Sequence, residues 1–264
     1  MSGQLGSGEM RKYIKSVFAV LTAAMMVIAS GCSGQKTVTI GIDSNAKPLS
    51  FRGEDGTPDG FIVELSREAA RRMGVSVKFK YVNIDDKSKA FNKDNVDVLW
   101  GKIEATDENK KNMLLTKNYM SDRQILLVNA DSVIESTLDL KDRPVGAVKN
   151  SDAEKALLNS SLISQVKDSK CEEFNDPVSA FAALDKSRID ALAVDLSYAS
   201  NSMSAHAEQY RILDTILANK QYSVAVRRND ALLRDKLEKA LSELKKDGTS
   251  SSISAKWFGR DLTE

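Results

Sequence analysis

Lys102 and Glu104 are the residues whose types and spacing come closest to those of a catalytic acid and base. Opposite charges two positions apart shift each other's pKa, and a carboxylate tuned in this way can act as a general base. Metal centres rich in imidazole and nucleophiles activated by histidine are disfavoured, because His206 is the one histidine of the chain. Lone carboxylates of this kind more often hold a ligand than transfer a proton, so we expect no enzymatic activity.

The remaining chemistry-bearing residues favour structural roles. His206 lies in a polar run and is expected on the surface of a helix, and Cys171 is a lone thiol expected to be part-buried. Residues 54–56 (EDG) lack the spaced carboxylates of a calcium loop, so they predict no metal site. Trp257-Phe258 is expected to fix the C-terminal helix in the core, and Trp100 is expected in the core as well. We expect no cofactor.

Composition excludes several classes of protein. The 264 residues carry 38 Lys plus Arg against 37 Asp plus Glu, a net charge of +1, which predicts no binding of nucleic acid. The hydrophobic content of 42% is ordinary for a globular protein of one large domain or two modest ones. Two cysteines, Cys32 and Cys171, cannot build the disulfide framework of a small secreted domain.

Residues 10–31 have the pattern of an export signal. Arg11, Lys12 and Lys15 form a positive start, and residues 17–28 are apolar or small. That run is much shorter than the ~20 residues of a membrane-spanning helix. The sequence therefore predicts an exported protein.

Cys32 follows Ser30-Gly31 in a pattern that resembles a lipobox, whose cysteine is lipidated and anchors the protein to a membrane. The alternative is a plain signal peptide with an incidental cysteine. Residues 32–36 then form a lipidated tether on the periplasmic or extracellular face. Residues 1–9 fit neither segment and are interpreted as an upstream start or a cloning scar.

The hydrophobic pattern predicts alternating strands and helices. Residues 37–42 alternate and are β-branched, residues 61–73 place Ile62, Leu65 and Ala69 on one helical face, and residues 75–82 alternate again. This strand–helix–strand order is typical of a parallel sheet.

A second series supports two similar lobes. It contains an apolar run at residues 125–128, residues 138–140, a strand at 145–148 and a helix from about Asp152. Residues 91–99 and 184–192 share one pattern of helix end, polar turn and apolar strand. A strand at 222–226 and an amphipathic helix at 230–246, stopped by Gly248, complete the chain.

Six stretches, in order and at matching separations, resemble the motifs of a known family: residues 48–51 (PLSF), 59–65 (DGFIVEL), 96–120, 139–146, 188–195 and 244–259, which ends KWFG. The family is the amino-acid-type extracellular solute-binding proteins of ABC transporters (family 3), in a lipoprotein form. The resemblance covers residues 36–261.

The resemblance implies an α/β fold of the two-lobed type II periplasmic-binding-protein class, in which each lobe has a central, mostly parallel sheet flanked by helices. Lobe 1 would comprise residues 36–124 and 223–264, and lobe 2 residues 125–222. Two crossovers, near residues 125–128 and 222–226, would form a hinge, and a ligand held by both lobes would favour the closed state.

The resemblance assigns eight positions to the ligand site: Asp43, Ala46, Ile84, Lys102, Glu104, Asn109, Ser151 and Asp195. Asp195 matches the acid that pairs with the α-ammonium of an amino acid, and Asp43 matches an acid at the end of the first strand. Ser151 retains the hydroxyl of a carboxylate-binding turn.

The other positions depart from the family pattern and predict a degenerate amino-acid pocket. Asn109 replaces the arginine that holds the α-carboxylate as a bidentate fork. Lys102 and Glu104 replace a glycine and a threonine, and Ala46 and Ile84 replace aromatic walls.

The acidic inventory predicts a solute that carries positive charge or that lacks the α-amino-acid head. The alternative is that Lys102 and Glu104 pair with each other and close a pocket that binds poorly. We expect a monomer that passes a small solute to an ABC permease, or alternatively a sensory or interaction protein with weak or no solute binding.

Overall fold

The computed structural model describes residues 36–205 and 208–264. The predicted export signal, Cys32 and His206 lie outside the described residues. Within the described part of the chain, the helices are all too short or too polar to cross a membrane.

The predicted strand–helix–strand unit is present near the start of the described chain. Strand β1 (Thr37–Ile42) leads through a turn into helix α2 (Phe61–Met73), and the chain returns as β5 (Ser76–Tyr81), which pairs with β1 in parallel. Helix α2 buries Phe61, Ile62, Leu65 and Ala69 and ends at Gly74, whose φ of 68° closes the last turn in the left-handed region.

The other elements of the first part of the chain are β2 (Asn45–Ala46), β3 (Ser50–Arg52), β4 (Pro58–Asp59), α3 (Lys87–Asn92), β6 (Val98–Leu99), α4 (Asp107–Asn112) and β7 (Leu114–Asn129). Those of the second part are η1 (Thr137–Leu140), β8 (Val145–Val148), α5 (Asp152–Leu158), η2 (Ser161–Ser164), η3 (Lys167–Ser169), β9 (Cys171–Phe174), α6 (Pro177–Asp185), β10 (Ala191–Asp195), α7 (Leu196–Ala205), β11 (Tyr210–Val226), α8 (Ala231–Lys246) and α9 (Thr249–Phe258).

Eight strands form one mixed sheet in the order β5-β1-β6-β11-β7-β10-β8-β9. Strands β5, β1 and β6 pair in parallel on one side, and β10, β8 and β9 pair in parallel on the other. The two groups of strands correspond to the two expected lobes, and the alternation of strands and helices confirms the predicted α/β class. The structure adds that the strands of both lobes are hydrogen-bonded into a single sheet.

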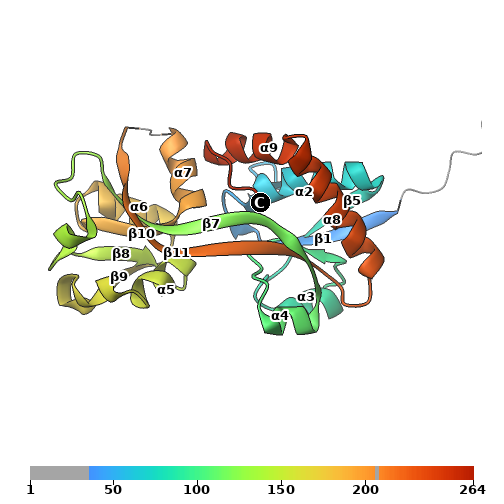
Figure 1. The fold of residues 1–264 in the computed structure, drawn as a ribbon, viewed down its shortest axis with the longest axis horizontal. Helices are drawn as coiled ribbons and strands as arrows, with labels where there is room; N and C mark the ends of the chain where they lie inside the picture. Colours follow the sequence, from blue (N-terminus) through green and yellow to red (C-terminus); the bar gives the residue numbers. More distant parts are fainter. Residues whose placement is uncertain (1–35, 206–207) are drawn as a thin grey trace, which may run out of the picture. The chain divides into compact units, whose positions relative to one another are not determined.

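The long antiparallel strands β7 and β11 join the two groups of strands (Figure 1). At one end, β11 pairs with β6 through Ala225 and Leu99. At the other end, β7 pairs with β10 through Leu127 and Leu192. Residues between these pairings, such as Asp122, are therefore held between the lobes by backbone hydrogen bonds on β7.

The C-terminal helix α9 is fixed in the core next to α2, as the sequence predicted for Trp257-Phe258. Phe258 is 1% exposed, and its ring centroid lies 5.0 Å from that of Phe61. Trp257 Nε1 donates a hydrogen bond to Glu64 Oε2 at 2.9 Å. Trp100 is fully buried against the edge of Tyr119, and Cys171 is half-buried, so these two predictions are also confirmed.

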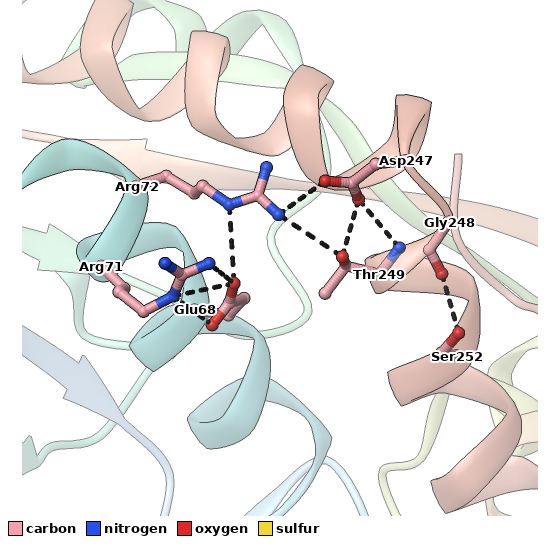
Figure 2. A network of polar contacts seen from close by, with 7 residues as sticks. All are labelled: Glu68, Arg71, Arg72, Asp247, Gly248, Thr249 and Ser252. Carbon is pink, nitrogen blue, oxygen red and sulfur yellow. Dashed lines mark hydrogen bonds and ion pairs between the residues drawn. The ribbon is translucent and has the colours of Figure 1, made fainter.

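A network of charges at the surface, with Arg72 and Glu68 half-buried, ties the end of α2 to the junction of α8 and α9 (Figure 2). Arg72 Nη2 lies 2.6 Å from Asp247 Oδ2, and Arg71 Nη2 lies 2.6 Å from Glu68 Oε1. Asp247 also accepts hydrogen bonds from the backbone and hydroxyl of Thr249. The network fixes three helices of the first lobe to one another.

Candidate functional site

A cluster of charged side chains lies where the two groups of strands meet. Lys102 follows β6 in one group, and Asp195 ends β10 in the other. Lys102 Nζ lies 2.5 Å from Asp195 Oδ2 and 4.0 Å from Asp122 Oδ2. One ammonium group therefore contacts carboxylates of β10 and of the connecting strand β7.

Polar residues of β7 and α7 hold these carboxylates in place. Gln124 Nε2 donates to Asp195 Oδ1 at 2.8 Å. Asp122 accepts hydrogen bonds from the backbone N–H and the hydroxyl of Ser197, at 3.0 and 2.6 Å. Asp122 and Gln124 are both fully buried, so their orientations are set by these contacts.

A third carboxylate lies close enough to act on Lys102. Asp152, at the start of α5, contributes to the electrostatic environment of Lys102 and accepts a hydrogen bond from the Tyr222 hydroxyl at 3.1 Å. The Lys102 ammonium lies 5.8 Å from the centre of the Tyr222 ring. The Asp152 carboxylate also lies 4.0 Å from Nζ of the exposed Lys155.

Burial and mutual charge shift the pKa values of the cluster. Burial disfavours the charged form of Lys102, but the Asp195 and Asp122 carboxylates more than offset it and raise its pKa. For Asp122, burial is the largest cause and raises the pKa to about 6; Lys102 opposes the shift, and the like charge of Asp195 adds to it. Lys102 thus stays charged, whereas burial disfavours the ionised form of Asp122.

A small hollow adjoins Asp195 in the second lobe. It has a volume of about 100 Å³, and Val148, Ser151, Ala180, Phe181 and Tyr198 are among the residues that line it with Asp195. Strands β8 and β10 are parallel and both end here, and ligands in α/β proteins commonly bind at the carboxyl ends of such strands. The lining is mostly apolar, so the hollow suits a small apolar group beside the carboxylate.

Of the eight predicted positions, the structure brings Lys102 and Asp195 into direct contact. Ser151 shares the hollow with Asp195, although its hydroxyl accepts the Glu154 N–H as the N-cap of α5. Ile84 lies against Gly101, the neighbour of Lys102.

Four predicted positions lie in other contacts. Both carboxylate oxygens of Glu104 accept hydrogen bonds from Lys220 Nζ, each at 2.9 Å. The side-chain amide of Asn109 donates a hydrogen bond to the Glu104 carbonyl at 2.7 Å. Asp43 accepts the Asn45 N–H at 2.8 Å, and Ala46 belongs to the short strand β2. Among the described residues, no hydrogen bond or ion pair joins these four to Lys102 or Asp195.

The alternative pairing of Lys102 with Glu104 is wrong. The Ile103 N–H donates to the Gly101 carbonyl at 2.9 Å, which makes a tight turn centred on Lys102. Because the chain reverses direction there, the two side chains point to different partners. Lys102 pairs with Asp195, and Glu104 pairs with Lys220.

Sequence reasoning missed Asp122, Gln124, Asp152, Ser197 and Tyr222. Asp122 and Gln124 carried a usable signal, because residues two apart in a strand share one face and these two directly precede the apolar run 125–128. Two polar residues on the buried face of a core strand indicate a polar site. The contact of Tyr222 with Asp152 joins residues 70 positions apart and has no comparable local signal.

The larger hollows of the described chain lie elsewhere. One of about 540 Å³ is lined by residues of β7, α8 and the C-terminal end, and one of about 940 Å³ by residues of α3, α4 and the β11–α8 loop. Neither contains Lys102 or Asp195, so size alone does not locate the charged cluster. Among the described residues, no group of His, Cys, Asp or Glu side chains has the arrangement of a metal site.

Relatives of known role match nearly the whole chain. The L-cystine-binding protein TcyJ of Escherichia coli (strain K12) is 27% identical over 264 residues, covering 96% of this chain and 97% of the relative. The lysine/arginine/ornithine-binding periplasmic protein of the same organism is 27% identical over 255 residues, covering 92% and 96%.

A solved structure also matches most of the chain. The substrate-binding protein of a polar amino acid ABC uptake transporter from Streptococcus thermophilus matches with a TM-score of 0.74 at 26% identity, covering 86% of this chain and 88% of that one. Substrate-binding proteins of this kind are components of transport systems that bind a solute and catalyse no reaction. The sequence model of the bacterial extracellular solute-binding proteins, family 3, matches residues 38–260, and this chain belongs to that family.

Proposed function

We propose that this chain captures a small solute through an ammonium or other cationic group, which binds the Asp195 carboxylate between the two lobes. The observation that carries the proposal is the position of the Lys102 ammonium, 2.5 Å from Asp195 Oδ2. A primary ammonium group of the protein itself occupies this place, so its size, charge and hydrogen-bonding geometry are compatible with the place.

The charge of the cluster favours a cation. Three carboxylates, those of Asp122, Asp152 and Asp195, act on Lys102, and Asp152 also lies 4.0 Å from the exposed Lys155. Negative charge is therefore in excess, and a cation relieves it whereas an anion adds to it. Gln124 Oε1 is buried and has no hydrogen-bond partner among the described residues, so it can accept from a further N–H of the solute.

The hollow beside Asp195 limits the size of the apolar part of the solute. Its volume of about 100 Å³ is smaller than the ~150 Å³ of a dry apolar cavity that accommodates benzene. A short aliphatic or thioether group fits this space better than an aromatic ring. The solute would then combine a cationic group with a small apolar arm.

The relatives support an amino-acid-like solute. Those named above are described as binding L-cystine and lysine, arginine or ornithine, and a structure from Streptococcus pneumoniae at 28% identity holds histidine. Each of these compounds carries an ammonium group. Asn109 lies in place of the expected arginine and braces a loop, so this chain would rely on the ammonium more than on the carboxylate.

We further propose that the captured solute is delivered to an ABC importer and that lipidated Cys32 anchors the protein to a membrane. The lobes would comprise residues 36–124 with 223–264, and 125–222, and would close about the strands that connect them. The pattern before Cys32 supports the anchor, and the match to uptake components supports delivery.

A panel of L-arginine, L-histidine and L-cystine, each beside its N-acetylated form, tests the proposal by thermal shift and calorimetry. We expect at least one free amino acid to stabilise the protein, by about 2.7 kcal/mol at a hundred times its Kd. At about pH 8 the N-acetylated forms of L-histidine and L-cystine, which then carry no cationic group, should have no effect, whereas N-acetyl-L-arginine keeps its guanidinium. Asp195→Asn should abolish the stabilisation.

The second candidate function is a sensory or interaction protein without a solute. It is favoured by the side chains of Glu104 and Asn109, which are engaged within the chain, and by Lys102, which already neutralises Asp195. Absence of stabilisation by every member of the panel, and by a broad set of polyamines, would favour this candidate and contradict solute capture.

A further inference from the structure

We propose that Lys102 is a tethered competitor for the solute: its ammonium occupies the Asp195 position and must be displaced before the cationic group of a solute can bind. This inference rests on the proposed function and adds a residue that sets affinity and selectivity. Its first support is the contact itself, between Lys102 Nζ and Asp195 Oδ2.

The backbone around Lys102 is fixed on both sides. The Tyr119 hydroxyl donates to the Gly101 carbonyl at 3.1 Å, and the Ser223 N–H donates to the Ile103 carbonyl at 2.8 Å. Ile103 is fully buried. Because both neighbours are anchored, the side chain of Lys102 is the movable part.

Both oxygens of Asp195 already have partners. Oδ1 accepts from Gln124 Nε2 at 2.8 Å, and Oδ2 contacts the Lys102 ammonium. An incoming ammonium that shared Oδ2 with Lys102 would lie next to a like charge in a partly desolvated place, which is unfavourable. Binding of a cation at Asp195 therefore requires Lys102 to leave.

The structure offers Lys102 a second resting position. Asp122 Oδ2 lies only 4.0 Å from its Nζ, and the side chain of Lys102 is 27% exposed, so a rotation of its outer bonds can move the ammonium toward Asp122 or toward solvent. Asp122 is fully buried and gains a closer counter-charge in this movement. Displacement thus does not leave Lys102 without a partner.

A tethered competitor also imposes selectivity. Compounds without a cationic group cannot replace an ammonium on a carboxylate, so they do not bind. A solute must add contacts that Lys102 does not make, for example with Gln124 Oε1 or in the hollow lined by Phe181 and Tyr198. Lys102 therefore lowers the affinity for any solute that does not make such additional contacts.

Calorimetric titration of L-arginine, L-histidine and L-cystine into wild-type protein and Lys102→Met tests the inference. Methionine keeps most of the length of the side chain and removes the charge. We expect the variant to bind the preferred amino acid at least ~10-fold more tightly, and Lys102→Met with Asp195→Asn to bind none.

Lys256→Met is the matched control, because Lys256 also contacts a carboxylate, Glu64, at 2.7 Å but lies on α9 outside the cluster. Its affinity should stay within twofold of the wild type. Lys102→Gln is the second variant if Lys102→Met folds poorly, and it should also bind more tightly.

The possible failures are distinguishable. Equal affinity of wild type and Lys102→Met, or weaker binding by the variant, would overturn the competitor while leaving solute capture in place; weaker binding would show that Lys102 contacts the solute. If neither protein binds any of the three compounds, the proposed function fails and the inference fails with it.

Discussion

The chain contains two charged networks, one on the surface of the first lobe and one between the lobes, and the pKa of one aspartate in each is shifted in opposite directions. In the surface network of Figure 2, Arg71 and Arg72 face Glu68 and Asp247, so positive and negative charges balance. In the cluster between the lobes, Lys102 contacts Asp122 and Asp195, and the charge of Asp152 also acts on it.

The pKa values follow from this difference. Hydrogen bonds from Thr249, together with Arg72, lower the pKa of Asp247 to about 2, and that side chain is 44% exposed. Burial raises the pKa of Asp122 to about 6, although Lys102 lies 4.0 Å away. Ion pairs at the surface fasten helices, whereas the cluster between the lobes keeps negative charge that a cationic solute can neutralise.

The largest expected effect is the loss of stability on removing the cation of the cluster. Lys102→Met leaves Asp122 and Asp195 without their counter-charge, and we expect a loss of about 3 kcal/mol in urea unfolding. The low end of the usual range applies because Lys102 is 27% exposed. A loss no larger than that of Lys256→Met would contradict the contrast between the two networks.

The second-largest expected effect is a pH dependence of stability that the cluster between the lobes has and the surface network lacks between about pH 4 and pH 7. A raised pKa means that the contribution of Asp122 to stability is fully present below pH 3.8 and is lost as the pH rises through about 6. Between about pH 4 and pH 7, the wild type should therefore lose about 2 kcal/mol relative to Asp122→Asn. Unfolding curves of both proteins across this range measure the difference, and parallel profiles would show that Asp122 titrates normally.

The hydrogen bond from the uncharged Tyr222 hydroxyl to Asp152 should contribute less to stability than the Lys102 ion pairs. Tyr222→Phe removes the 3.1 Å contact with Asp152 and should cost about 1 kcal/mol, because the carboxylate of Asp152 stays partly exposed and can bind water. The affinity for a cationic solute should change little. A large loss of affinity without a loss of stability would instead place the Tyr222 hydroxyl in contact with the solute.

The surface network should give the smallest effect. Arg72→Met removes the contact with Asp247 and should lower Tm by no more than about 3 °C, because exposed ion pairs contribute little. A depressed pKa means that the contribution of Asp247 is present above pH 3.8 and is lost as the pH falls through about 2. The difference between variant and wild type should therefore shrink in strong acid and in high salt.

Local patterns were sufficient to predict much of the fold. The helix at residues 61–73 is confirmed to the residue, because its apolar face and the stop at Gly74 are both encoded locally. The strand at 37–42 and its parallel partner are confirmed for the same reason.

The long connecting strands were only partly visible in the sequence. The apolar runs 125–128 and 222–226 indicated their ends, yet β7 spans Leu114–Asn129 and β11 spans Tyr210–Val226. Polar residues such as Lys117, Asp122 and Lys220 interrupt the alternation. The pairing of Ser121 with Gln221 joins segments 100 positions apart and cannot be read from a local window.

Two residues of the charged cluster were named from the sequence, but their contact was not. The resemblance named Lys102 and Asp195, which the structure joins across 93 positions. Proximity in sequence suggested the pair Lys102 and Glu104, and the turn at Gly101–Ile103 prevents it.

A crystal structure of the protein with the tightest-binding amino acid of the panel tests the central claim most directly. We predict the ammonium nitrogen of the solute at ~3 Å from the Asp195 carboxylate, with Lys102 moved toward Asp122. A solute bound elsewhere, with Lys102 still on Asp195, would contradict the account.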